Sequence, residues 1–368
     1  MKVVRAAVNR HGGALSSSVG CAAGQWTARE GLCLRLFDGS GRTGIGEASP
    51  LPGHSPDSLE DALVFLRRAA ELIVDTSVEN MEGVPLIKEL QRRMAGEADS
   101  RSGRFALETA VLDLQGQQAD VPLWQILGGC GCFKTIGVNA LVDWRDGGNR
   151  IESFLNAGIR AFKVKVGIPR TTIEEEMTSL RKLRNRLGDD VEIRLDANGV
   201  FQIGEAMMRM HQYAQIKPAF IEEPVKGRAL SGLKRTPVSL AADESLADES
   251  CAEGLLACGN MSVFVLKPAL LGGLLAARHL ARAAQRSGKD VVITHMYEGP
   301  IALRACTHLA FSLERPPLAC GLLHHPGLDV WPPVEGAPVT HAGLRQVPRC
   351  VGLGVDADAF AEACGWMD

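Results

Sequence analysis

The chain has 368 residues, of which 46% are hydrophobic and 23% are charged, and its formal net charge is -3. This length favours a barrel with a second domain over one small core, and the composition is that of an ordinary soluble globular protein. With 40 basic and 43 acidic residues, no basic run and only 5% aromatic residues, we expect no nucleic-acid partner.

The hydropathy and cysteine patterns predict a cytoplasmic protein. Charges interrupt the N-terminus before an apolar signal segment could form, and no membrane span is expected because no long apolar run occurs. The ten cysteines include no Cys-x-x-Cys pair, and Cys130 and Cys132 have no second pair at zinc spacing. We therefore expect reduced thiols. The pair His324-His325 is expected at a strand end rather than on a metal.

The first hundred residues predict a small α+β domain. Residues 31–38 alternate like a strand, Gly39-Ser40-Gly41 is a turn signal, and residues 43–48 would complete a hairpin. Helical periodicity follows at residues 59–72 and 84–94.

A polar, glycine-containing linker at 96–104 precedes an amphipathic helix at 105–119. Thr172 and Glu175 match a capping box, which predicts a helix to about Leu187. From residue 136 onward apolar strands alternate with helices, which is typical of a parallel sheet with helical crossovers. The candidate strands lie at residues 136–142, 161–166, 191–195, 219–222, 239–243, 262–267, 291–294 and 319–323.

Charged side chains recur at the ends of five of these strands. From Lys165 the steps to Asp196, Glu222, Asp243 and Lys267 are 31, 26, 21 and 24 residues. Each step is about the length of one strand and one crossover helix, so a (β/α) barrel would bring all five side chains to the same end of one cavity.

The alternation of side chains along a strand extends this set. Lys163 shares a face with Lys165, and Arg194 and Asn198 share the face of Asp196. Three carboxylates suit Mg²⁺, and the absence of His or Cys at the corresponding positions argues against zinc. Any one motif could be a structural ion pair or an exposed strand end, but all five in order favour a site.

These motifs resemble the enolase superfamily in its muconate-lactonising-enzyme-like branch. The matching segments are FKVKVG (162–167), RLDANG (194–199), IEEP (221–224), AADES (241–245), VLKP (265–268) and the helix at 105–129. The resemblance implies an α/β fold with a modified TIM-type (β/α)7β barrel over residues 105–325. It also implies an α+β capping domain over residues 1–104, to which a tail over residues 326–368 returns.

The resemblance further implies Mg²⁺ on Asp196, Glu222 and Asp243, with Lys165 as the acid/base and Lys267 on the opposite face. A proton next to a carboxylate is weakly acidic, and a bound Mg²⁺ would stabilise the enediolate left by its removal. A lysine serves as the base when burial and neighbouring cations lower its pKa. Lys163 would either act directly or support Lys165 as such a charge, and Arg194 and Asn198 would orient the site.

The substrate is expected to be a small carboxylate. The segment PLPGHS, within 44–62, is similar to a loop of the o-succinylbenzoate synthases, which favours a dehydratase of menaquinone biosynthesis, although this string is also simply turn-forming. THMYEGP (294–300) departs from the serine-rich segment common in those enzymes. An N-acylamino acid racemase, a dipeptide epimerase, a muconate-type cycloisomerase and a non-catalytic binding protein remain open, as does a homo-oligomer.

Closure of the site is expected to come from the capping domain. Gly12-Gly13 and the small-residue run 16–24 are interpreted as a mobile loop because they lack strong periodicity. Together with residues 51–54, this loop should cover the barrel mouth and exclude water.

Overall fold

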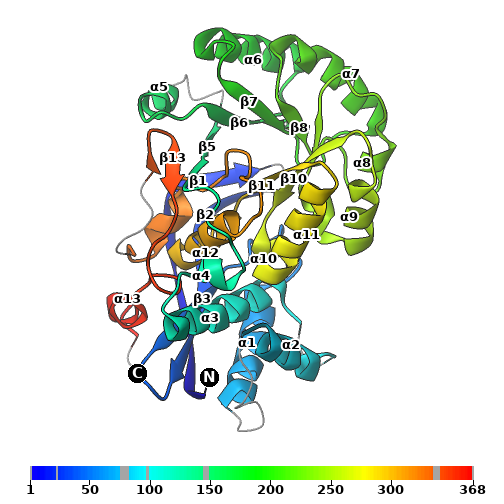
Figure 1. The fold of residues 1–368 in the computed structure, drawn as a ribbon. Helices are drawn as coiled ribbons and strands as arrows, with labels where there is room; N and C mark the ends of the chain where they lie inside the picture. The colour runs from blue at the N-terminus through cyan, green and yellow to red at the C-terminus, as the bar shows by residue number, and fades with distance from the viewer. Residues whose placement is uncertain are drawn as a thin grey trace.

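The computed structural model describes residues 2–21, 24–74, 83–96, 99–143, 149–334 and 340–366. Figure 1 shows two regions, with the N-terminal helices at the bottom, an N-terminal sheet that rises from there to the middle of the view, and an array of parallel strands flanked by helices in the middle and upper part. The N-terminal sheet is antiparallel, in the order β1 (Val3–Cys21), β2 (Gly24–Asp38) and β3 (Thr43–Ala48). The predicted strands at 31–38 and 43–48 are therefore confirmed.

The mobile loop predicted at Gly12-Gly13 and residues 16–24 is wrong wherever the structure describes it. These residues lie in β1 and at the start of β2, where Gly12 pairs with Glu30 and Val19 pairs with Trp26. Residues 22 and 23 lie outside the described residues. Small residues hide the alternation of a strand in the sequence, and here the pairing partner supplies the extended structure that local propensity does not.

Three helices complete the N-terminal region: α1 (Leu59–Val74), α2 (Gly83–Met94) and α3 (Arg101–Ala119). The helix α3 begins within the predicted linker because Ser100 caps it, its side chain accepting a hydrogen bond from the backbone N–H of Gly103. Asp57 also accepts hydrogen bonds from the Ser102 hydroxyl and backbone, which ties the start of α3 to the segment before α1.

Gly46 lets β3 approach α3 closely, because a Cβ at this position would overlap the carbonyl oxygen of Ala106. We expect Gly46→Ala to lower the free energy of unfolding by about 1–3 kcal/mol or more through this overlap. The control is Gly254→Ala in α9 (Glu249–Leu256), where a Cβ meets nothing within 4 Å and where we expect no loss or a gain of about 0.5–1 kcal/mol. Equal urea midpoints for the Gly46→Ala variant and the unmodified protein would contradict the close approach.

Seven parallel strands form one sheet in chain order, and crossover helices connect them (Figure 1). The strands are β5 (Asn139–Val142), β6 (Ala161–Lys165), β7 (Glu192–Asp196), β8 (Phe220–Glu222), β9 (Leu240–Ala242), β10 (Met261–Leu266) and β11 (Asp290–Ile293). The helices that accompany them are α5 (Asn149–Asn156), α6 (Ile173–Leu187), α7 (Ile203–Tyr213), α8 (Ala229–Gly232), α9, α10 (Pro268–Leu271), α11 (Leu274–Arg286) and α12 (Pro300–Phe311). The capping box of Thr172 and Glu175 opens α6 as predicted.

Two predicted strands differ from the structure. The candidate at 136–142 divides into β4 (Thr135–Gly137) and β5, because β4 leaves the parallel sheet to pair with β13 (Leu344–Gln346). The candidate at 319–323 forms no regular strand. Its neighbourhood nevertheless bridges both edges of the sheet: the N–H of Leu318 donates to Val291 O, and the N–H of Asn139 donates to Cys320 O, both at 2.9 Å.

The C-terminal tail contains a 3-10 turn at Pro326–Val330, β12 (Thr340–His341), β13 and α13 (Ala357–Ala363). The strands β12, β13 and β4 form a small antiparallel sheet. The 3-10 turn contacts the N-terminal hairpin, where a ring nitrogen of His11 lies 2.8 Å from Val330 O.

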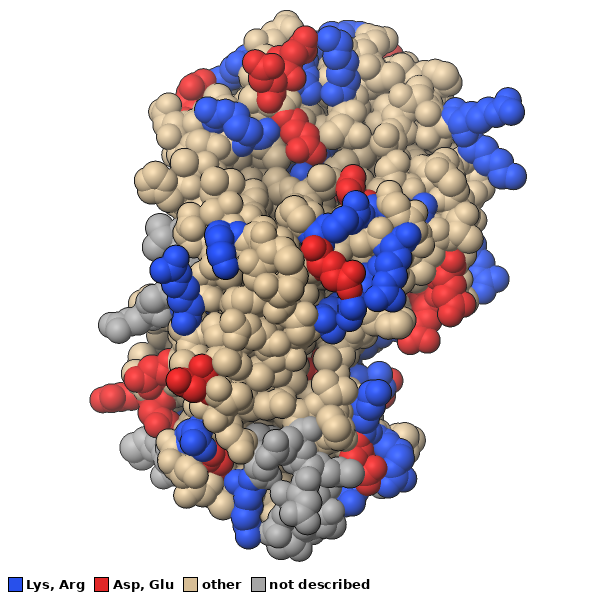
Figure 2. Space-filling view, in the orientation of Figure 1, with Lys and Arg blue, Asp and Glu red and all other residues tan. Residues whose placement is uncertain are grey.

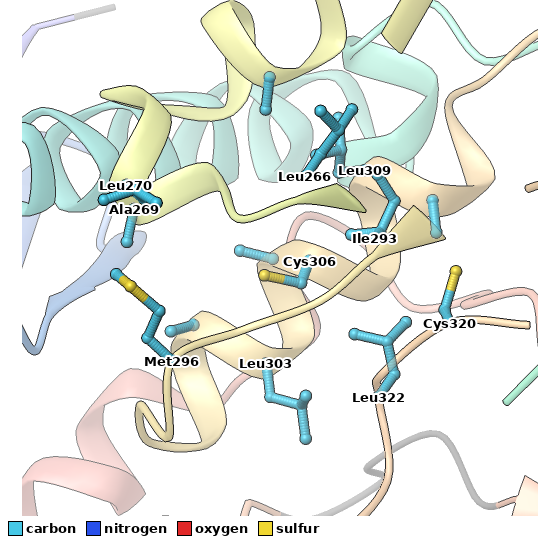
Figure 3. Packing of buried hydrophobic residues seen from close by; sticks show 14 of the residues in the cluster. Leu266, Ala269, Leu270, Ile293, Met296, Leu303, Cys306, Leu309, Cys320 and Leu322 are labelled. Atoms are coloured by element: carbon cyan, nitrogen blue, oxygen red, sulfur yellow. The ribbon is translucent and has the colours of Figure 1, made fainter. Parts of the chain in front are cut away.

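A continuous apolar core lies between the parallel strands and their helices. Figure 3 shows Leu266 of β10 and Ile293 of β11 packing against Leu309 and Cys306 of α12, all of them buried. Burial of this apolar surface is the main favourable contribution to folding. On the face in Figure 2, basic and acidic side chains are interspersed. Within the described residues, no helix is long and apolar enough to span a bilayer.

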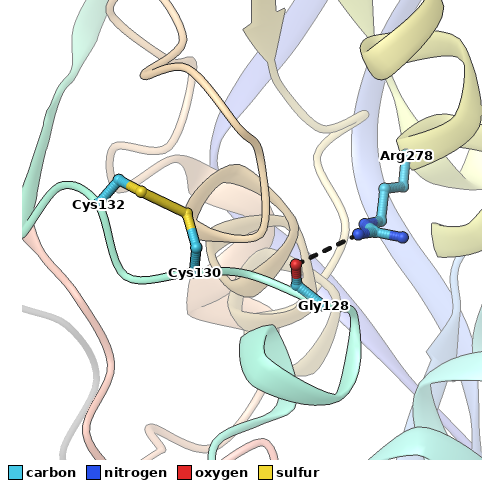
Figure 4. The surroundings of a disulfide bond; sticks show 4 residues. All are labelled: Gly128, Cys130, Cys132 and Arg278. Carbon is cyan, nitrogen blue, oxygen red and sulfur yellow. Dashed lines mark hydrogen bonds between the residues drawn. A yellow bond between two sulfur atoms is a disulfide. The ribbon is translucent and has the colours of Figure 1, made fainter.

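The expectation of reduced thiols is wrong for one pair. Cys130 and Cys132 form a disulfide in the exposed loop after α4 (Leu123–Ile126), near the hydrogen bond from Arg278 to the carbonyl oxygen of Gly128 (Figure 4). Gly131 has a φ of 66°, a conformation that glycine adopts freely, and the two cysteine Cα atoms lie 5.5 Å apart. The other cysteines whose side chains are described are free.

Candidate active site

The five predicted strand-end side chains lie together. In the sheet register Lys165 is opposite Asp196, and Asp196 is opposite Glu222. Asp243 directly follows β9, and Lys267 directly follows β10. The carboxyl ends of adjacent parallel strands meet at one edge, so the fold gathers these groups from distant parts of the sequence.

The three lysines contact the carboxylates directly. Lys163 Nζ lies 2.8 Å from Asp196 Oδ2 and also donates to Glu222, while Lys165 Nζ lies 2.6 Å from the same Asp196 oxygen. Lys267 donates to Asp243. The three carboxylates are almost completely buried, so each depends on these ammonium groups for compensation of its charge.

The electrostatics of the three carboxylates differ. Burial raises the pKa of Glu222 well above its usual value, and the negative charge of Asp196 adds to the effect. Burial also raises the pKa of Asp243, as does the charge of Glu244. Burial alone would raise the pKa of Asp196, but the ammonium groups of Lys163 and Lys165 outweigh burial and hold that pKa below its usual value.

The carboxylates raise the pKa of two of the lysines, Lys163 and Lys267. Burial would lower the pKa of Lys267, but the carboxylates of Asp243 and Glu244 outweigh it and hold the pKa well above the usual value. The pKa of Lys163 is raised in the same way by Asp196 and Glu222. In this arrangement both side chains are cations.

The donor set suits a hard divalent cation. Asp196, Glu222 and Asp243 are adjacent and buried, and Asp243 Oδ1 has no hydrogen-bond partner among the described residues. As they stand, no group of three His, Cys, Asp or Glu side chains in the described part of the chain is arranged to hold a metal ion, and Lys163 Nζ contacts both Asp196 and Glu222. Carboxylate oxygens are the ligands that Mg²⁺ prefers, so the donor atoms suit this ion in kind, although their present arrangement is that of ion pairs with the lysines.

Glu223 connects the loops around these carboxylates through hydrogen bonds. Its side chain accepts hydrogen bonds from the backbone N–H groups of Asp243 (2.9 Å) and Ser245 (3.1 Å), and its carbonyl oxygen accepts from the N–H of Gly199. Glu223 has a φ of 44°, an uncommon conformation for a non-glycine residue. It therefore holds the ends of three neighbouring strands in register from outside the cavity.

A cavity of about 780 Å³ lies above the strand ends. Lys163, Lys165, Asn198 and Lys267 line its base. Its upper wall comes from the N-terminal domain, namely Ser17, Ser18, Val19, Gly20, Gly24, Gln25, Leu51 and His54. The expectation that residues 16–24 and 51–54 cover the barrel mouth is thus confirmed for residues 17–20, Gly24, Leu51 and His54, although a hairpin rather than a mobile loop provides part of the cover.

A buried arginine fixes this cover in place. Arg29 of β2 donates to the carbonyl oxygens of Ser49 (2.5 Å) and Pro50 (2.8 Å), just before the covering loop, and to Tyr297 O (3.1 Å) on the barrel. Glu47 accepts hydrogen bonds from backbone N–H groups at the start of α12, including that of Ala302 at 3.1 Å. The two regions are therefore joined by buried polar contacts beside the cavity.

Arg194 does not line the cavity. It is buried inside the parallel array, where it donates to the carbonyl oxygen of Ala319 and to Glu192, and its guanidinium lies 5.1 Å from the centre of the Phe220 ring. The structure thus places Arg194 one layer below Asp196, in contact with the segment that bridges the edges of the sheet.

Several cavity residues were not predicted as site residues. His295, Tyr297 and His325 line one wall, with the rings of His295 and His325 stacked at 4.0 Å between centroids. Neither ring nitrogen of His325 has a hydrogen-bond partner among the described residues. Glu244 also lines the cavity, as does His54, which lies in the expected covering segment 51–54 but had no role assigned to its side chain. Their positions after strands and in the covering loop could have indicated that these residues line the site. A single histidine in a loop, however, is weak evidence for a functional role.

Residues 148–361 match the family described as enolase C-terminal domain-like, and residues 20–128 match the mandelate racemase / muconate lactonizing enzyme N-terminal domain. The chain belongs to the enolase superfamily. Its resemblance to the muconate-lactonising branch extends over both regions of the fold.

Characterised members of the superfamily include relatives with different reactions. The L-Ala-D/L-Glu epimerase of Bacillus subtilis (strain 168) is 27% identical over 85% of this chain and 86% of its own length. Muconate cycloisomerase 1 of Pseudomonas putida is 26% identical over 89% of this chain and 88% of its own length. The dipeptide epimerase of Enterococcus faecalis V583, solved with Mg and the dipeptide L-Leu-L-Tyr, has a TM-score of 0.82 at 24% identity, covering 96% of this chain and 99% of the other.

Proposed function

We propose that this protein is a Mg²⁺-dependent enzyme that removes and returns a proton at the carbon next to a substrate carboxylate. The observation that carries the proposal is the placement of Lys165 and Lys267 at the base of one cavity. Lys165 comes from β6 and Lys267 from the end of β10, and the three strands between them end in carboxylates. A substrate above those carboxylates would have one lysine on either side.

Asp196, Glu222 and Asp243 would hold the ion, each through carboxylate oxygen. The bound ion would supply Lewis-acid stabilisation of the enediolate charge that develops when the proton leaves. It would also add positive charge beside the lysines, which offsets the carboxylates that now keep Lys163 and Lys267 protonated. Lys163 would leave its position between Asp196 and Glu222 and remain as a neighbouring charge.

The two lysines would share the proton transfer. One takes the proton from its face of the substrate as a neutral amine, and the other, as an ammonium, delivers a proton to the opposite face. Such a transfer inverts the configuration at that carbon, which is the outcome of racemisation or epimerisation. The cover formed by Leu51, His54 and the hairpin would exclude water from the exposed carbanion.

The substrate class follows from this reaction and from the named relatives. Two of the three reported above are dipeptide epimerases, so we propose a dipeptide or an N-acylated amino acid as the substrate. Both classes carry an amide nitrogen on the carbon that loses its proton. This favours the isomerase alternative over the dehydratase that PLPGHS led us to expect.

A dehydratase of the o-succinylbenzoate synthase type is the second candidate. Its support is the position of Leu51 and His54, both within the PLPGHS segment, on the wall of the cavity. In that reaction Lys165 would take the proton and return it to the departing hydroxyl, while Lys267 would stay cationic.

One assay separates these reactions. The purified protein with Mg²⁺ is incubated with L,L-dipeptides, with N-succinylamino acids of each configuration, and with the hydroxycyclohexadiene substrate of the dehydratase. Change of configuration detected by chiral chromatography, without loss of the dienyl chromophore, is expected. Loss of the chromophore alone would replace the isomerase by the dehydratase, and inactivity towards all three would contradict the proposal.

A further inference from the structure

Glu244 connects the two lysines across the base of the cavity. Lys165 Nζ donates to Asn198 Oδ1 at 2.6 Å, and Asn198 Nδ2 donates to Glu244 Oε1 at 3.0 Å. Lys267 Nζ donates to the same Glu244 oxygen at 3.4 Å. Asn198 therefore links Lys165 to Glu244, and Glu244 contacts Lys267 directly.

The same glutamate also meets the cover. His54 Nε2 lies 3.6 Å from Glu244 Oε1, and the exposed fraction of the His54 side chain is only 12%. The other carboxylate oxygen of Glu244, Oε2, is buried and has no hydrogen-bond partner in the described part of the chain. Glu244 is thus approached by groups from β7, β10 and the N-terminal domain, all through Oε1.

The two lysines differ in how they contact Glu244. Lys267 contacts two carboxylates, Asp243 and Glu244, whereas Lys165 contacts Asp196 and the neutral oxygen of Asn198. Both hydrogen bonds have an ammonium donor and are charge-assisted, but Glu244 contacts Lys267 directly, whereas it is linked to Lys165 through Asn198. Loss of the Glu244 carboxylate would therefore act directly on the Lys267 face of a substrate and only indirectly on the Lys165 face.

We infer that Glu244 is the positioning residue for Lys267, and that His54 fixes the Glu244 carboxylate when the covering loop lies over the cavity. This inference rests on the proposed function, and it assigns the covering loop a second task besides exclusion of water. The loop that covers the cavity thus also supports the position of one of the two lysines. Since a small misplacement of a catalytic group is costly, the effect should appear in turnover on the Lys267 face.

Exchange of the substrate α-proton for solvent deuterium reports each face separately. The probes are N-succinyl-L-phenylalanine, N-succinyl-D-phenylalanine, L-Ala-L-Glu and L-Ala-D-Glu, observed by proton NMR in D₂O with Mg²⁺. The configuration whose exchange is lost in Lys267→Ala marks the Lys267 face. Glu244→Gln should slow exchange on that face by about tenfold or more, and on the Lys165 face by less than about threefold.

His54→Gln provides the second variant, because it removes the imidazole without touching either lysine. It should slow the Lys267 face in the same direction, and the double variant should be no slower than Glu244→Gln alone, since the two residues act through one contact. Glu205→Gln, a half-buried glutamate on α7 that pairs with Arg209 and does not line the cavity, is the control and should leave both faces unchanged. Equal losses on both faces, or additive losses in the double variant, would overturn the inference, whereas no exchange by the unmodified protein with any probe would overturn the proposed function itself.

Discussion

Lys165→Arg is expected to lose turnover by about 10²–10⁴-fold, the usual contribution of a general acid or base. A guanidinium remains protonated at working pH, so it can stay near Asp196 but cannot accept the substrate proton. Steady-state turnover with Mg²⁺ measures the loss, with Lys182→Arg, an exposed lysine on α6, as the matched control.

Lys267→Arg distinguishes the two candidate reactions. In the isomerase, Lys267 must itself give and take a proton, so the variant should not racemise but should still exchange the proton that Lys165 removes. In the dehydratase, Lys267 contributes only charge, and its arginine variant should keep measurable activity. Dehydration by Lys165→Arg, together with an inactive Lys267→Arg, would reverse the roles assigned to these lysines.

Asp243→Asn is the second change with a large expected effect. The variant keeps the shape of the side chain but removes the charge that a hard cation requires, and Asp196→Asn and Glu222→Gln should behave alike. We expect loss of nearly all turnover and at least about tenfold weaker Mg²⁺ binding by calorimetry, because coordinating charge supports affinity.

The control for the metal prediction is Asp189→Asn, whose carboxylate lies on the surface beside Lys217. Circular dichroism should show that each active-site variant remains folded. Retention of Mg²⁺ affinity and turnover by a folded Asp243→Asn variant would remove this carboxylate from the proposed ion site.

The arrangement of the candidate site was predictable because parallel strands convert sequence spacing into position. The strand-end residues Lys165, Asp196 and Glu222 lie opposite one another on adjacent strands. Locating the strands in the sequence was therefore enough to predict that these side chains lie close together. The capping box of α6 was equally local, since Thr172 and Glu175 specify it within four residues.

Features that depend on distant partners were not predictable in the same way. The β1–β2 hairpin is extended because of the pairing between its own strands, although its small residues show no alternation. The position of Arg194 depends on contacts inside the parallel array. Its guanidinium donates a hydrogen bond to Ala319 O and lies over the Phe220 ring. The stacked pair His295 and His325 arises from two segments that meet only in the folded chain.

The most direct test of the central claim is deuterium exchange at the substrate α-carbon by the unmodified protein, followed by proton NMR in D₂O. Parallel samples contain Mg²⁺ or EDTA, with the same dipeptide and N-succinylamino acid probes. We predict loss of the α-proton signal of a probe in both configurations with Mg²⁺, no loss with EDTA, and recovery when Mg²⁺ is returned in excess. Exchange that persists unchanged in EDTA, or no exchange of any probe with Mg²⁺ present, would contradict metal-assisted proton transfer between Lys165 and Lys267.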